Sequence, residues 1–133
     1  MKATELRIGN LVFGIDDFNH GKKVIDTIAV ITQYGWETIK GFNGIEPIPL
    51  TEEWLIKFGA KKVKGIGDKY WYSIILFDEV ENWNKPFIYY SPDNDYAELL
   101  DSEHEERITV IKYVHHLQNL YFALTGEELE IKE

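Results

Sequence analysis

Residues 69–77 read KYWYSIILF, and this stretch decides the fold class of the chain. Successive side chains of a β-strand point to opposite faces of its sheet. As a strand, the stretch is mostly apolar on both faces, with Tyr70, Tyr72, Ile74 and Leu76 on one and Trp71, Ser73, Ile75 and Phe77 on the other. Such a strand is usually central and covered on both sides. We therefore expect a central strand that is covered on both faces.

Further β-rich runs flank this strand. The run KKVK at 61–64 is joined to it by the glycine-containing loop GIGD, which predicts a β-hairpin. Beyond it, PFIYYS at 86–91, DYAELLD at 95–101 and RITVI at 107–111 supply up to three more strands, although DYAELLD also fits a helical turn. Together the runs predict an antiparallel sheet.

The N-terminal third of the chain also reads as β-structure. β-branched residues are dense in KKVIDTIAVITQY, and turn signals interrupt residues 5–40 at Gly14, at 19–21 and at Gly35. This spacing predicts short strands in a small curled sheet, and we expect an SH3-like β lobe.

Two helices are predicted. Thr51 is suited to cap a helix at 52–58, directly after the proline-containing segment 46–50, and Gly59 is suited to end it. The C-terminal stretch 113–126 reads YVHHLQNLYFALTG and predicts an amphipathic helix at 113–124. Its apolar stripe is expected to face the sheet and consists of Val114, Leu117, Tyr121 and Leu124. Its far side is expected to carry His115, Gln118, Asn119 and Phe122.

These elements predict an α+β protein with a β lobe, a short helix, an antiparallel sheet and a C-terminal helix packed on the sheet. At 133 residues the chain is long enough for one compact domain with its own core. We expect a single domain over residues 1–133, within which 1–46 forms the β lobe and 47–133 the α+β lobe.

The charge of the chain is acidic and uneven. The formal net charge is −9, and residues 78–106 alone hold ten acidic residues and one lysine. Proteins that bind nucleic-acid backbones need a basic surface, so we expect no direct binding of this kind. With no cysteine, disulfides, thiolate nucleophiles and cysteine-ligated metals are excluded. No secretion signal or membrane span is evident, and we expect a cytoplasmic protein.

Three blocks carry a resemblance: LRIGN at 6–10, PIPLTEEWL at 47–55 and IKYVHHLQNLYFALTGEEL at 111–129. They resemble a group of small uncharacterised proteins of phages and mobile elements of gut anaerobic bacteria. Glutamine is common in that group where this chain has His116, so the resemblance implies that the histidine pair is not a shared site. It implies a biological setting and no mechanism.

We expect no metal, cofactor or catalytic site. His115 and His116 are adjacent on a helix and point roughly 100° apart, whereas ligands on one helix face are spaced by three or four residues. A calcium loop starting at Asp93 fails at its sixth position, where glycine is required. The run GIGDK lacks the spacing of a phosphate-binding loop, and no serine has a nucleophile-elbow context.

Aromatic residues crowd positions 70–96 and form the remaining functional lead. Each can belong to the core or to an exposed aromatic platform on a sheet face that no helix covers. The residues expected to contact a partner are Trp83, Asp78, Glu79, Glu81, Tyr96 and Phe122. We expect a non-catalytic protein-binding accessory protein. The alternatives are an acidic nucleic-acid mimic that occupies a host protein, and an enzyme or sugar-binding module.

Overall fold

The computed structural model describes residues 5–32, 34–42, 44–65, 67, 69–76, 86–101 and 106–132. The chain divides into two compact units. Unit 1 comprises Met1–Ile48 and Tyr113–Asn119, and unit 2 comprises Pro49–Lys112 and Leu120–Glu133.

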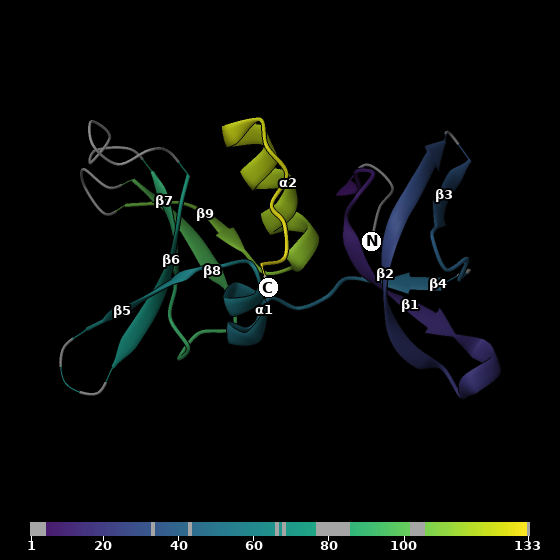
Figure 1. Cartoon of the computed structure of the whole chain (residues 1–133), viewed down its shortest axis with the longest axis horizontal. Coiled ribbons are helices and arrows are strands. Elements are labelled where there is room, and N and C mark those ends of the chain that lie inside the picture. The colour runs from purple at the N-terminus through teal and green to yellow at the C-terminus, as the bar shows by residue number, and fades with distance from the viewer. Residues whose placement is uncertain are drawn as a thin grey trace. The chain divides into compact units, whose positions relative to one another are not determined.

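Unit 1 contains a curved antiparallel sheet with the strand order β3-β2-β1-β4 (Figure 1). Its strands are β1 (Leu11–Asp16), β2 (Lys22–Thr32), β3 (Gly35–Thr38) and β4 (Gly44–Glu46). The short 3-10 helix η2 (Asp17–Asn19) makes the turn between β1 and β2. A bulge between Ile28 and Val30 interrupts the pairing of β2 with β3, and such bulges increase the twist of a sheet. The curled sheet fits the expected SH3-like lobe.

The core of unit 1 lies inside this curved sheet. Leu6, Val12 and Ile28 are buried together, and Ile31, Trp36 and Ile45 pack against them. Removing such apolar side chains from water is the main favourable term in folding. The unit therefore holds its own hydrophobic core.

Unit 2 contains a five-stranded antiparallel meander in the order β5-β6-β7-β8-β9. The strands are β5 (Lys61–Lys64), β6 (Tyr70–Ile75), β7 (Phe87–Tyr90), β8 (Ala97–Asp101) and β9 (Glu106–Ile111). The predicted pairing of the run at 61–64 with the following strand β6 is confirmed, as are the three later strands, and residues 97–101 of DYAELLD form a strand rather than a helical turn.

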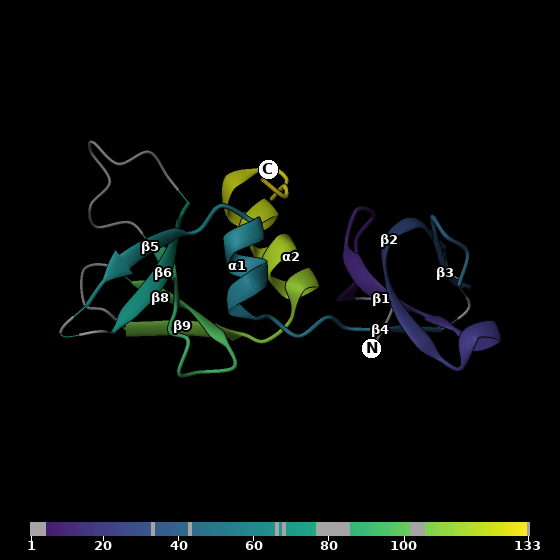
Figure 2. The ribbon, with the colours of Figure 1, turned by 60° about the horizontal axis from the view of Figure 1, so that its bottom comes forward.

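One face of this sheet forms the core of unit 2 together with α1 (Glu52–Lys57). The buried side chains of that face are Tyr72, Ile74, Ile88, Tyr90, Ala97, Leu99 and Ile111. Figure 1 and Figure 2 show α1 and the C-terminal half of α2 (Val114–Thr125) on this same side of the sheet. Trp54, Leu55 and Phe58 supply the buried side chains of the α1 region.

Local sequence signals explain the two ends of α1 only in part. Thr51 has the extended backbone of an N-cap, but its side chain makes no capping hydrogen bond. At the other end, Gly59 has a φ of +80° and donates its N–H to the Ile56 carbonyl, the left-handed ending that glycine allows.

Helix α2 corrects the predicted orientation of its polar face. Its first part belongs to unit 1 and its last part to unit 2. His115 and Gln118, which were expected on the exposed side, are only 1% and 4% exposed, whereas Phe122 is 39% exposed. The single-stripe expectation is wrong for the first part of the helix because residues 5–11 of unit 1 cover its polar side.

The α+β class with two antiparallel sheets and a C-terminal helix is confirmed. Within the described part of the chain, neither helix has the length and apolarity needed to cross a membrane.

Candidate functional site

The second face of the five-stranded sheet carries an aromatic cluster. Trp71 on β6 lies with its ring centroid 5.2 Å from that of Tyr89 and 6.5 Å from that of Phe87, both on β7. Strand pairing places these residues on one face because Ser73, two positions after Trp71, is paired with Tyr89. All three aromatic side chains are half-buried. We call Trp71, Phe87 and Tyr89 the aromatic face.

Aliphatic and charged residues surround the aromatic face. Trp71 is paired with Val63, Phe87 with Leu100 and Tyr89 with Glu98. The Glu98 carboxylate forms an ion pair with Arg107 at 3.2 Å. The arrangement is an apolar centre with a charged edge.

The expected partner-contacting residues are only partly placed by the structure. Trp83, Asp78, Glu79 and Glu81 lie outside the described residues. Two of the six are described: Tyr96 is half-buried with the Arg107 guanidinium 5.8 Å from its ring, and Phe122 is partly exposed on α2. Trp71 and Tyr89 belong to the aromatic residues of 70–96 that the sequence offered for a platform, but they were not among the six residues expected to contact a partner.

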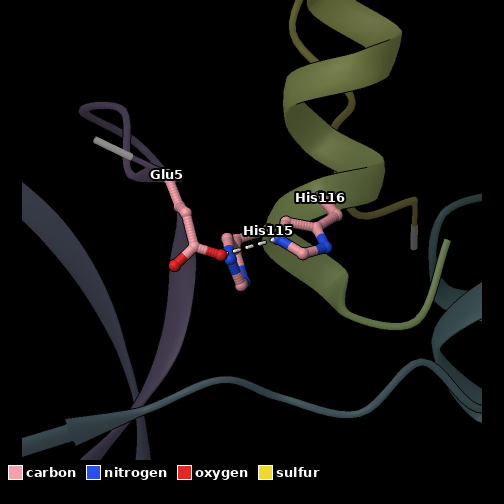
Figure 3. Close-up of side chains that lie close together, drawn as sticks. All are labelled: Glu5, His115 and His116. Carbon is pink, nitrogen blue, oxygen red and sulfur yellow. Dashed lines mark hydrogen bonds and ion pairs between the residues drawn. The ribbon is translucent and has the colours of Figure 1, made fainter. Parts of the chain in front are cut away.

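A second group of chemically capable side chains lies in unit 1 and consists of Glu5, His115 and His116 (Figure 3). We call it the histidine cluster. The Nε2 atom of His116 lies 3.2 Å from Oε1 of Glu5, and the two imidazole centroids are 4.2 Å apart. One nitrogen or oxygen of each residue lies within 4.8 Å of those of the other two. The expectation that the adjacent rings diverge is therefore wrong.

His115 is the buried member of the cluster. Its ring is stacked on Tyr113, with centroids 5.9 Å apart, and among the described residues neither ring nitrogen has a hydrogen-bond partner. Burial lowers the pKa of His115 to about 4, and the neighbouring His116 acts in the same direction while Glu5 opposes it. His115 is consequently a neutral imidazole at neutral pH.

An amide network holds the N-terminal segment against the first part of α2. Gln118 accepts a 2.8 Å hydrogen bond from the Leu11 N–H and donates a 3.2 Å bond to the Gly9 carbonyl. Asn119 donates to the Glu5 carbonyl at 2.8 Å and accepts from the side chain of Asn10 at 2.7 Å. This network fixes the backbone of Glu5 beside the two histidines.

Unit 2 has a polar cluster of its own at the start of α1. The Glu52 carboxylate oxygen Oε1 accepts hydrogen bonds from the hydroxyls of Tyr72 at 2.7 Å and Tyr70 at 3.1 Å. Burial, aided by the bond to Glu52, raises the pKa of Tyr72 to about 12. These groups satisfy one another's hydrogen-bonding capacity, so we interpret the cluster as structural rather than reactive.

Comparisons with known proteins add no relative: no family model, curated protein or solved structure matches the chain. The function must therefore be argued from the geometry of the two sites.

Proposed function

We propose that the protein is a non-catalytic binding protein that docks a partner protein on the aromatic face of unit 2. The carrying observation is the contact cluster of Trp71 with Phe87 and Tyr89, on the sheet face opposite to that of Tyr72, whose hydroxyl bonds to Glu52 of α1. This function is the one expected from the sequence, but the residue at the centre of the binding surface is Trp71 instead of Trp83.

The composition of the aromatic face supports a protein partner. Tryptophan and tyrosine are enriched among the residues that dominate binding energies, particularly at the centre of an interface with a polar rim. Aliphatic Val63 and Leu100 extend the apolar centre on either side. A sugar site would instead need several free polar groups beside the rings, and the Glu98 carboxylate is already engaged by Arg107.

The acidic sequence that contains β7 and β8 supports a basic partner, although strand β5 of the same sheet carries Lys61, Lys62 and Lys64. The segment 78–106, which includes β7 and β8, holds ten acids against one lysine. A partner with an apolar patch ringed by lysine or arginine would gain both apolar burial and electrostatic complementarity. We infer a basic protein surface as the occupant.

The same charge run favours a second candidate, an acidic mimic of nucleic acid that occupies a basic groove. Binding of that kind depends on many charge pairs and weakens steeply with salt. Docking centred on Trp71 and its neighbours depends on apolar burial and is far less sensitive to salt.

The experiment is a comparative capture with matched variants. Wild type, Trp71→Ala and Tyr89→Ala are immobilised beside Tyr34→Ala, which removes an aromatic side chain that is 91% exposed in unit 1. Circular dichroism first establishes that all four proteins are folded. We expect a basic protein retained by wild type and by Tyr34→Ala but lost with both aromatic-face variants.

The salt dependence of that complex then separates the two candidates. Retention that survives high salt supports docking on the aromatic face. If both aromatic-face variants retain every protein that wild type retains, the proposal fails. If, in addition, all retention disappears at high salt, the nucleic-acid mimic is favoured.

A further inference from the structure

We propose that the histidine cluster binds a divalent transition-metal ion, with Zn²⁺ as the best-matched candidate, through Glu5, His115 and His116. This reverses the expectation that the chain binds no metal. It is independent of the proposed protein docking, since the cluster belongs to unit 1 and the aromatic face to unit 2.

The donor set is the first reason. Two imidazoles and one carboxylate are a known zinc ligand set, in which the metal keeps a fourth position for water or another ligand. The ligand atoms of a tetrahedral zinc site with bonds of about 2.0 Å lie roughly 3.3 Å apart. Oε1 of Glu5 and Nε2 of His116 are already 3.2 Å apart, so only the ring of His115 has to approach further.

The condition of His115 is the second and independent reason. An imidazole buried to 1% exposure with both nitrogens unpaired among the described residues loses the hydrogen bonds that water gives it in the unfolded chain. Buried polar groups are nearly always partnered, and an unpaired one calls for an explanation such as an ion. Coordination to a metal beside Glu5 and His116 would supply that partner.

Access and connectivity suit the proposed site. The side chains of Glu5 and His116 are 35% and 36% exposed, so an ion can reach the cluster from solvent. Glu5 and His116 are 111 positions apart in sequence, yet both belong to unit 1. A bound ion would therefore cross-link the N-terminal segment to α2 and stabilise the folded state of this unit.

Zinc titration of the untagged full-length chain tests the proposal. After treatment with a chelator and its removal, isothermal titration with ZnCl₂ should show one saturable equivalent, and thermal unfolding should move to higher temperature with added zinc. Glu5→Gln and His116→Gln are the deciding variants because both side chains are partly exposed and their loss should not prevent folding. Each should weaken zinc binding at least about tenfold, since even partners that only orient metal ligands contribute that much.

Matched controls exclude general surface binding. His20→Gln alters an exposed histidine, and Glu46→Gln alters a carboxylate of the same unit that pairs with Lys23. Both should leave the zinc affinity unchanged. Absence of saturable binding, equal affinity in Glu5→Gln and His116→Gln, or an equal loss in His20→Gln would each overturn the proposal.

Discussion

The polar clusters of the two units differ in how their hydrogen bonds are satisfied. In unit 2, Glu52 accepts hydrogen bonds from Tyr70 and Tyr72 on the neighbouring strand. In unit 1, His115 is more deeply buried than Glu52, yet neither of its nitrogens is bonded among the described residues. The hydrogen bonds of the unit 2 cluster explain it as part of the architecture of the fold. In the unit 1 cluster, burial of the unbonded His115 ring costs free energy that no hydrogen bond among the described residues offsets.

That difference helps to separate structure from function. A satisfied buried polar group contributes modestly to stability, whereas an unsatisfied one costs about 1 to 3 kcal/mol. An unsatisfied buried polar group is therefore a reason to look for a functional role or a ligand that compensates its free-energy cost. The histidine cluster is therefore the better place to look for chemistry, although the aromatic face is the better place to look for a protein partner.

The largest expected effects test whether the apolar surroundings of the two clusters are alike. Leu117 in unit 1 and Leu55 in unit 2 are both fully buried. Leu117→Ala and Leu55→Ala should each lower the free energy of unfolding by about 2 to 5 kcal/mol, because each leaves a cavity. Urea denaturation followed by circular dichroism measures the loss. A much smaller effect for Leu117→Ala would mean that the first part of α2 is less tightly packed than its burial indicates.

The next test removes a satisfied bond. Tyr72→Phe keeps the aromatic ring and deletes the 2.7 Å hydrogen bond to Glu52. We expect a loss of about 1.5 kcal/mol in the free energy of unfolding. Tyr70→Phe is the matched control and should lose less, since its bond is 3.1 Å long and its side chain is only half-buried. If both variants lost equally little free energy of unfolding, the contrast between the two clusters would be contradicted.

The same tyrosine predicts a smaller, pH-dependent effect. Tyr72 has its pKa raised to about 12 in the folded protein, while an unfolded tyrosine ionises near 10. Its contribution to stability is thus fully present below pH 10 and is lost as the pH rises from about 10 to 12, because the unfolded chain releases its proton first. Melting temperatures across this range should fall more steeply for wild type than for Tyr72→Phe. Parallel curves would contradict the raised pKa.

The smallest effect is expected at the unsatisfied group. His115→Phe replaces an unpaired buried imidazole with an apolar ring of similar shape. In the presence of a chelator, the free energy of unfolding should change by less than about 1 kcal/mol or should increase, because no hydrogen bond is lost. Chemical denaturation with EDTA measures it. A loss as large as that of Tyr72→Phe would show that His115 has a hydrogen-bond partner after all.

The regular elements were largely predictable from the sequence because their signals are local. The two-residue alternation in KYWYSIILF identified β6 and placed Tyr72 and Trp71 on opposite faces, but it predicted cover on both faces and did not predict that Trp71 is only half-buried. The spacing of Val114, Leu117 and Tyr121 located α2, and Gly126, with a φ of +76°, ends it as expected. Periodicity and turn chemistry act over a few residues, so a short window of sequence contains them.

The candidate sites depend on contacts between residues that are distant in the sequence, so no short window of sequence contains them. By itself the sequence determined two β-rich regions, the short helix α1 and an amphipathic C-terminal helix. Only the tertiary structure decided that residues 5–11 cover the polar side of α2, where the Leu11 N–H meets the Gln118 side chain across 107 positions. A helical period gives the direction of each side chain but not what lies opposite it. His115 was for that reason expected at the surface, and the fold instead buries it beside Glu5 and His116.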